Sequence, residues 1–133
     1  MATDGLITMP SAFDPAETVR RLEAEVKARG MTIFAHIDHA AGAAAAGMAL
    51  RPTDLLVFGA AKGGTPLMEM AQTIGIDLPL KALVWQDAAG ATWLSYNDPD
   101  WLAERHGLSP KPAAALNALS AALKAVATTA TAK

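Results

Sequence analysis

The sequence predicts an α+β fold, in which an antiparallel or mixed sheet carries helices packed on one face. A capped amphipathic helix lies between two β-rich runs near the N-terminus. The stretch 50–85 is typical of a strand, a glycine-rich turn, a helix and a second strand. Two β-rich runs then flank a short turn within 81–97, which predicts a hairpin. We therefore expect the order β-α-β-β-α-β-β-α plus an extra C-terminal helix, with a short helix after the second strand, in a single domain over 1–133.

The first two elements follow from local signals. An apolar run at 5–9 predicts the first strand. Asp14 is a good N-cap residue, Pro15 suits the first helical position, and Glu17 is placed to complete a capping box. Gly30 ends this helix as a left-handed cap.

The middle of the chain alternates strands with short helices. Apolar and polar residues alternate in 31–40, which predicts the second strand. The alanine-rich segment 40–48 favours a short helix ended by Gly47. The continuous apolar run 54–60 predicts a third strand that is buried on both faces.

Further on, Thr65 can cap a helix that starts at Pro66 and ends at Gly75. After the 81–97 hairpin, Asp98 and Pro99 begin another short helix, which closes at His106-Gly107. A leucine stripe predicts a last helix over 113–127, followed by a frayed tail at 128–133.

Composition excludes several functional classes. The 133 residues carry a net charge of −2 and lack the basic face that a nucleic-acid binder needs. With zero cysteines there is no thiolate nucleophile and no cysteine-ligated metal. The N-terminus has an acid at Asp4 and no apolar signal region, and no apolar run approaches the length of a membrane span. We expect a soluble cytoplasmic protein with no cofactor, no nucleic-acid partner and no membrane role.

Several motifs in this order resemble the domain-of-unknown-function family 302, over roughly residues 5–107. They are Phe34-x-x-Ile37-Asp38-His39-Ala40, Leu50-x-Pro52-Thr53, Leu56-x-Phe58-Gly59, Lys62-x-Gly64-Thr65-Pro66-Leu67-Met68, Asp77-Leu78-Pro79-Leu80-Lys81, and Trp85-x-Asp87 followed by Ser95-Tyr96. One departure is Ala60-Ala61, where the family usually shows Asn-Pro. The resemblance implies a compact α+β fold and a homodimer, and it implies no agreed activity.

The resemblance also singles out the polar residues His39, Asp77 and Tyr96. One hypothesis makes His39 and Asp77 an acid/base pair, with Tyr96 hydrogen-bonding a substrate. The alternative, which we favour, makes Asp77 a cap or a structural ion pair that His39 or Lys81 could complete.

The segment 59–65 combines glycines, Lys62, a hydroxyl at Thr65 and an expected helix start. It does not match a P-loop, because Lys62 precedes Gly63 and Gly64 instead of following the last glycine. An anion could still bind the amides at 65–67, although a simple strand-to-helix turn explains the glycines equally well.

His36, Asp38 and His39 suggest a metal cluster at first sight. On a strand, residues 36 and 38 share one face and residue 39 points to the other, so we predict no metal site and keep His36 and His39 only as weak candidates.

Three functions therefore remain open. The first is a dimeric module that binds a small ligand or anion near His39, Lys62, Gly64, Thr65, Asp77 and Tyr96. The second is an enzyme that uses the His39–Asp77 pair on a small substrate, and the third is a purely structural interaction domain. Trp85 and Trp93 could cover one sheet face, line a pocket or form a subunit interface. We lean toward binding rather than turnover.

Overall fold

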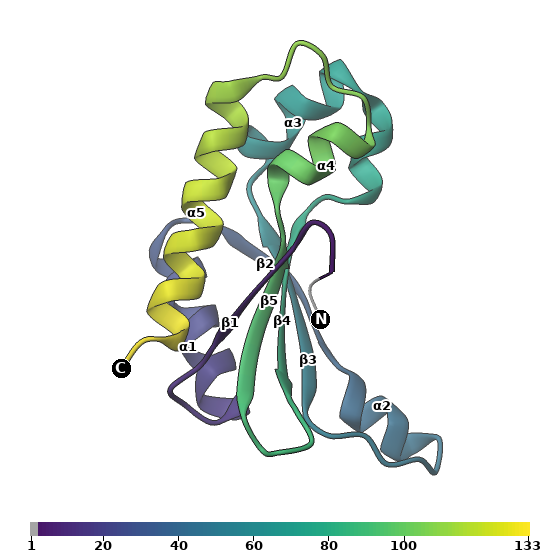
Figure 1. The fold of residues 1–133 in the computed structure, drawn as a ribbon, viewed down its shortest axis with the longest axis vertical. Helices are drawn as coiled ribbons and strands as arrows, with labels where there is room; N and C mark the ends of the chain where they lie inside the picture. Colours follow the sequence, from purple (N-terminus) through teal and green to yellow (C-terminus); the bar gives the residue numbers. More distant parts are fainter. Residues whose placement is uncertain (1–2) are drawn as a thin grey trace.

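The computed structural model describes residues 3–133 and contains a five-stranded antiparallel sheet in the order β1-β5-β4-β3-β2 (Figure 1). The strands are β1 (Leu6–Pro10), β2 (Thr32–Asp38), β3 (Thr53–Gly59), β4 (Leu80–Gln86) and β5 (Thr92–Asn97). The helices are α1 (Pro15–Ala28), α2 (His39–Ala45), α3 (Ala61–Met70), the 3-10 helix η1 (Gln72–Ile76), α4 (Pro99–Arg105) and α5 (Ala113–Thr131). The predicted α+β class and element order are confirmed.

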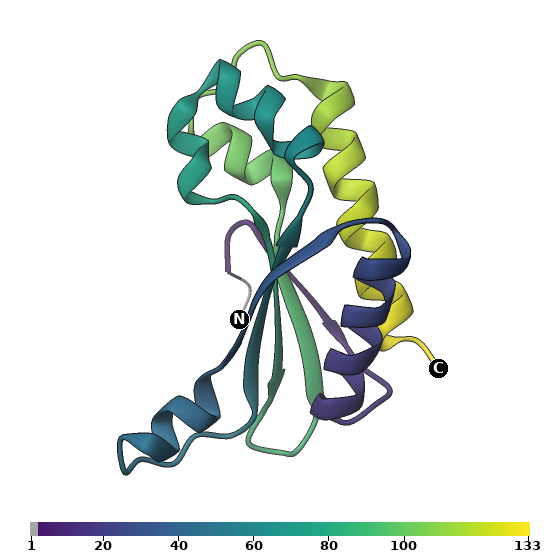
Figure 2. The same cartoon turned by 180° about the vertical axis from the view of Figure 1, so that it is seen from behind.

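Helices α1 and α5 cover one face of the sheet, and α3, η1 and α4 gather at one end of it (Figures 1 and 2). The covered face is built from side chains that alternate along each strand. They pack with apolar residues of α1 and α5 into one hydrophobic core, whose fully buried members include Leu22, Val26, Leu56, Phe58, Val84, Leu94, Leu116, Leu123 and Val126.

The opposite side of the sheet, here called the open face, is not covered by these two helices. The strand register places on it the side chains of Leu6, Thr8, Leu55, Leu83, Trp85, Trp93 and Ser95. Along β3, Leu55 and Val57 are only half-buried, whereas Leu56 and Phe58, which alternate with them, are buried. The prediction that 54–60 is buried on both faces is therefore wrong, because helices pack on one side only.

Helix α1 begins as its cap residues predict. Asp14 Oδ1 accepts a hydrogen bond from the amide of Glu17 at 2.8 Å, and Pro15 is the first helical residue. The carboxylate of Glu17 pairs with Arg20 and Arg21, so it does not complete a capping box. Gly30 has a φ of +76°, as expected of a left-handed cap.

Helix α3 differs from the prediction. It begins at Ala61, so Gly63, Gly64, Thr65 and Pro66 lie inside it, and it ends at Met70 before the separate turn η1. A Cβ on Gly63 would lie 3.1 Å from Leu119 Cδ2. Gly63 thus lets the helix approach α5 closely, a tertiary contact that helix propensity does not register.

Helix α5 is longer than predicted. It continues to Thr131, and Ala130 and Thr131 are buried instead of frayed. The carbonyl of Thr131 accepts a hydrogen bond from the amide of Ala12 at 2.8 Å, which ties the helix end to the loop before α1. Among the described residues, α5 is the one helix that has the length and apolar composition of a membrane span. Core helices pass the same test, and its leucine stripe lies in the hydrophobic core.

Candidate functional site

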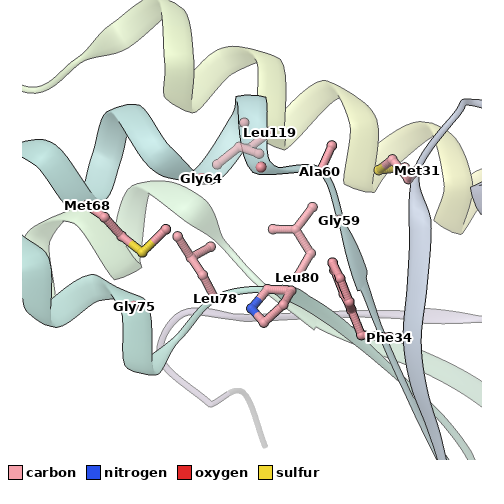
Figure 3. Close-up of a pocket in the computed structure, with 13 residues that line it drawn as sticks. Met31, Phe34, Gly59, Ala60, Gly64, Met68, Gly75, Leu78, Leu80 and Leu119 are labelled. Carbon is pink, nitrogen blue, oxygen red and sulfur yellow. The ribbon is translucent and has the colours of Figure 1, made fainter.

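An apolar pocket of about 290 Å³ lies between the first turns of α3, the start of β4 and helix α5 (Figure 3). Its thirteen lining residues are all Gly, Ala, Pro, Leu, Met or Phe. They are Met31, Phe34, Gly59, Ala60, Ala61, Gly63, Gly64, Met68, Gly75, Leu78, Pro79, Leu80 and Leu119. Backbone groups are the only polar groups that this lining can offer a ligand.

Glycines keep the pocket open. A Cβ on Gly64 would lie 3.3 Å from Leu78 Cδ1, and one on Gly75 would lie 3.2 Å from Met68 Sδ. Larger side chains at these positions would occupy the space that the pocket now provides. Met68 borders it with an unbranched, adaptable side chain that can reshape the wall around a ligand.

Phe34 lies at the side of the pocket formed by β2 (Figure 3). The pairing of β2 with β3 shifts register between Ile33 and Ala35, and such a bulge re-aims the side chain at the extra residue. Phe34 is 56% exposed, an unusual position for a large aromatic side chain. It is therefore available to contact a molecule that enters the pocket.

The residues predicted from the sequence do not converge on this pocket as a group. Gly64 lines it, and Lys62 and Thr65 are its neighbours on α3. The amides at 65–67, where we expected an anion to bind, lie inside α3 and not at its N-terminus. The N-terminus of α3, where the helix dipole favours an anion, is instead at Ala60.

His39 and Tyr96 border a second depression, of about 420 Å³, on the open face. Lys81, Leu83 and Trp85 also line it. Tyr96 pairs with Ile7 and Ala82 across the sheet and belongs to the hydrophobic core, so its ring lies on the covered side. Burial, with a contribution from Asp98, raises the pKa of Tyr96 above its usual value.

The structure brings Asp77 to His106 and Arg105, not to His39. Asp77 Oδ2 lies 2.5 Å from His106 Nε2, and both carboxylate oxygens accept from Arg105 at 2.9 Å. His39 directly follows Asp38, which pairs with Asp54 at the start of β3. Asp77 lies three residues before Leu80, which pairs with Phe58 at the end of β3. The two residues are therefore at opposite ends of the sheet. The favoured structural ion pair of Asp77 is thus present with a different partner, and the hypothesis of a His39–Asp77 acid/base pair lacks its contact.

His106 forms a second contact that the sequence analysis missed. Its Nδ1 lies 2.9 Å from Oγ1 of Thr73, so hydroxyl, imidazole and carboxylate are connected in one row. That connectivity occurs in nucleophilic sites. However, Thr73 is exposed on η1, and none of Thr73, Asp77 and His106 lines the apolar pocket or the depression on the open face. We interpret these hydrogen bonds as a structural contact that holds η1 against the end of α4.

His36 lies between two carboxylates on the covered side of the sheet edge. Its Nδ1 is 3.2 Å from Glu23 and its Nε2 is 2.9 Å from Asp54. His39 borders the open face instead. Within residues 3–133, no group of three His, Cys, Asp or Glu side chains is arranged to hold a metal ion.

Comparison with known proteins places the chain in a family. The model of the family described as "Domain of unknown function DUF302" matches residues 7–126. The chain belongs to the DUF302 family. A crystal structure of an uncharacterised conserved DUF302 protein from Bacillus stearothermophilus superimposes with a TM-score of 0.83 at 19% identity, covering 96% of this chain and 99% of that one. This likeness confirms the fold.

Two curated relatives share more sequence with this DUF302 protein but are longer. They are "Fluoride-specific ion channel FluC 1" of Brucella suis and "Fluoride-specific ion channel FluC 2" of Brucella melitensis, each 47% identical over 115 residues. The match covers 86% of this chain but only 45% and 43% of the two relatives. The chain therefore spans less than half the length of the curated relatives it matches.

The departure from the DUF302 pattern at Ala60-Ala61 lies at the start of α3. Ala60 is the N-cap residue and makes no side-chain capping bond, and Ala61 is the first helical residue. The family's Asn-Pro would place Asn at the N-cap and Pro at the first helical position, which are the favoured sites of both.

Proposed function

We propose that this DUF302 protein binds a small apolar ligand in the pocket between α3, β4 and α5. The observation that carries the proposal is the lining, which consists entirely of apolar residues arranged around glycines (Figure 3). Ligand sites are typically concave and mostly apolar, and they start at about 300 Å³. A pocket of about 290 Å³ therefore suits a compact ligand.

The lining also selects among the ligand classes. An anion needs a cation or free amides, and the nearby Lys62 is a neighbour of lining residues rather than one of them. An apolar molecule loses unfavourable contact with water when it enters such a site. We accordingly propose binding of an apolar ligand instead of an anion, and binding instead of turnover.

The channel names of the Brucella relatives describe chains more than twice as long as the shared segment. Spanning a bilayer through helices requires about 20 apolar residues for each span. The part of this chain that the structure describes has one helix of such length and composition, and that helix lines the core. We propose that channel activity in those relatives resides outside the shared segment.

Thermal denaturation with small apolar probes tests the proposal. Medium-chain alcohols and small aromatic hydrocarbons should raise the melting temperature, because a ligand at 100 times its Kd stabilises by about 2.7 kcal/mol. Sodium fluoride, tested in parallel, should leave it unchanged.

Matched variants locate the effect. Ala61→Leu places a larger side chain in the pocket wall, and Ala114→Leu makes the same change at an exposed position of α5 outside the pocket. Ala61→Leu should abolish the stabilisation by probes and Ala114→Leu should retain it. Equal stabilisation of both variants would place the ligand elsewhere, and no stabilisation by any probe would reject the proposed function.

A further inference from the structure

A lysine without an ion-pair partner lies on the open face. Lys81 belongs to β4, the central strand of the sheet. Val57 pairs with it on β3, and Asn97 lies beside it on β5, because Tyr96 pairs with Ala82. Neither of these two neighbours is charged. None of the ion pairs within residues 3–133 includes Lys81.

The depression of about 420 Å³ on this face offers hydrogen-bond donors and no negative charge. Lys81, Asn97 and His39 line it, and each can donate a hydrogen bond. Among the described residues, no aspartate or glutamate lines it. The side chains of these three residues take part in none of the hydrogen bonds found within residues 3–133. The depression is therefore complementary to an anion.

The burial of Lys81 strengthens this complementarity. Its side chain is half-buried, so its ammonium group has lost part of its hydration. A carboxylate placed beside it would offset that loss through a charge-assisted hydrogen bond, which is about twice as strong as a neutral one. Asn97, also half-buried, is close enough along the sheet to serve the second oxygen of the same carboxylate.

The rest of the depression is apolar and aromatic. Leu55, Leu83 and Trp85 line it. The indole Nε1 of Trp85 donates to Ser95 Oγ at 2.9 Å, and its ring stacks on Trp93 with centroids 6.1 Å apart. The polar atom of Trp85 is thus already paired within the sheet, so the ring offers a ligand its apolar surface.

The spacing along β4 relates the charged part to the apolar part. Lys81, Leu83 and Trp85 alternate on one side of the strand. At a rise of about 3.3 Å per residue, the Cα atoms of Leu83 and Trp85 lie roughly 7 Å and 13 Å from that of Lys81. An acidic group held at Lys81 therefore places an attached body of one or two rings over Leu83 and toward Trp85. A small inorganic anion would forgo this apolar contact.

We propose that the depression on the open face binds a small aromatic carboxylate. The Lys81 ammonium pairs with the carboxylate, the Asn97 amide donates to it, and the ring lies over Leu83 and Trp85. This second site is independent of the apolar pocket, because the two share no lining residue. Its ligand differs in class as well, since the lining of the apolar pocket contains no charged side chain.

Isothermal titration calorimetry with two matched probes tests the proposal. 2-Naphthoate and 2-naphthamide share their ring system, but only the first carries a charge. The wild type should bind the carboxylate at least about tenfold more tightly than the amide. Lys81→Met retains an unbranched side chain without the charge, and it should bring the ratio of the two dissociation constants close to one. Lys81→Arg should preserve the ratio.

Two control variants localise the binding. Lys62→Met removes an exposed lysine on α3, and Ala61→Leu fills the wall of the apolar pocket. Both should keep the wild-type preference for the carboxylate. Circular dichroism melts check that each variant is folded, and Lys81→Gln provides a second uncharged replacement.

Three results would overturn the proposal. A wild type that binds neither probe has no such site. Equal affinity for the carboxylate and the amide would mean that Lys81 only extends its charge into water along the apolar surface. A preference that survives Lys81→Met and Lys81→Gln but disappears in Lys62→Met would place the anion at the start of α3 instead.

Discussion

The carboxylate of Asp77 lies 2.5 Å from Nε2 of His106, and this contact joins the segment after η1 to the end of α4. The side chains are 12% and 8% exposed, so the pair is largely withdrawn from water. Arg105 and Thr73 complete its hydrogen bonds. The contact holds together the end of the molecule that forms one side of the apolar pocket.

Replacing His106 by Ala should destabilise the protein by about 1–3 kcal/mol, because the nearly buried Asp77 loses a hydrogen-bond partner. Urea denaturation measures the loss. Glu104→Gln is the control, because Glu104 pairs with Lys111 at 2.9 Å on an exposed surface, where an ion pair contributes about 1 kcal/mol or less. Equal urea midpoints for His106→Ala and Glu104→Gln would contradict a stabilising role of the His106–Asp77 contact.

The elements that local signals specify were predictable from the sequence. Asp14 and Pro15 predicted the start of α1, and Gly30 its end, because capping acts through neighbouring residues. The hairpin between β4 and β5 was predictable for the same reason, since its turn is closed by Asp87 and Gly90.

The candidate site was less predictable. The start of α3 depends on glycines at Gly63 and Gly64 that fit against α5 and Leu78, and such contacts are tertiary. Asp77 was expected to be a cap or a structural ion pair completed by His39 or Lys81, whereas its partners are Arg105 and His106. These stand 28 and 29 residues away at the end of α4, so their proximity could not be read from spacing. The apolar pocket draws on residues from Met31 to Leu119, and no short motif contains it.

The start of α3 can be stabilised. Ala60 has the extended backbone of an N-cap residue, with φ −140° and ψ 140°, but no side-chain oxygen to accept from the first turn. Ala60→Asn should raise the free energy of unfolding by about 0.5–2 kcal/mol. Ala60→Leu, which has similar size and no capping oxygen, is the control. Both are measured by urea denaturation without ligand, and equal stability of the two variants would show that α3 gains nothing from a cap.

Gly5 tests close packing at the beginning of β1. It has a φ of +74°, and a Cβ there would lie 2.3 Å from Cδ2 of Trp101. Gly90 has a similar φ of +88° but open space around it. Gly90→Ala should lower the free energy of unfolding by about 1–2 kcal/mol, because alanine is strained in the left-handed backbone conformation. Gly5→Ala should cost more, because the indole of Trp101 must also move, and tryptophan fluorescence should report that movement. A smaller loss at Gly5 than at Gly90 would refute the packing argument.

Tyr96 connects the core to the pH dependence of stability. Burial first, and Asp98 second, raise its pKa above the usual 10.0. A raised pKa in the folded state means that the neutral phenol stabilises the fold below pH 10 and that this contribution is lost as pH rises through the folded pKa. Tyr96 is the single tyrosine of the chain, so tyrosinate absorbance reports it alone. The absorbance midpoint of the folded protein should lie at higher pH than that of the urea-unfolded chain, and Tyr96→Phe should flatten the loss of stability above pH 10. Identical midpoints in both states would show that the phenol is not held in the core.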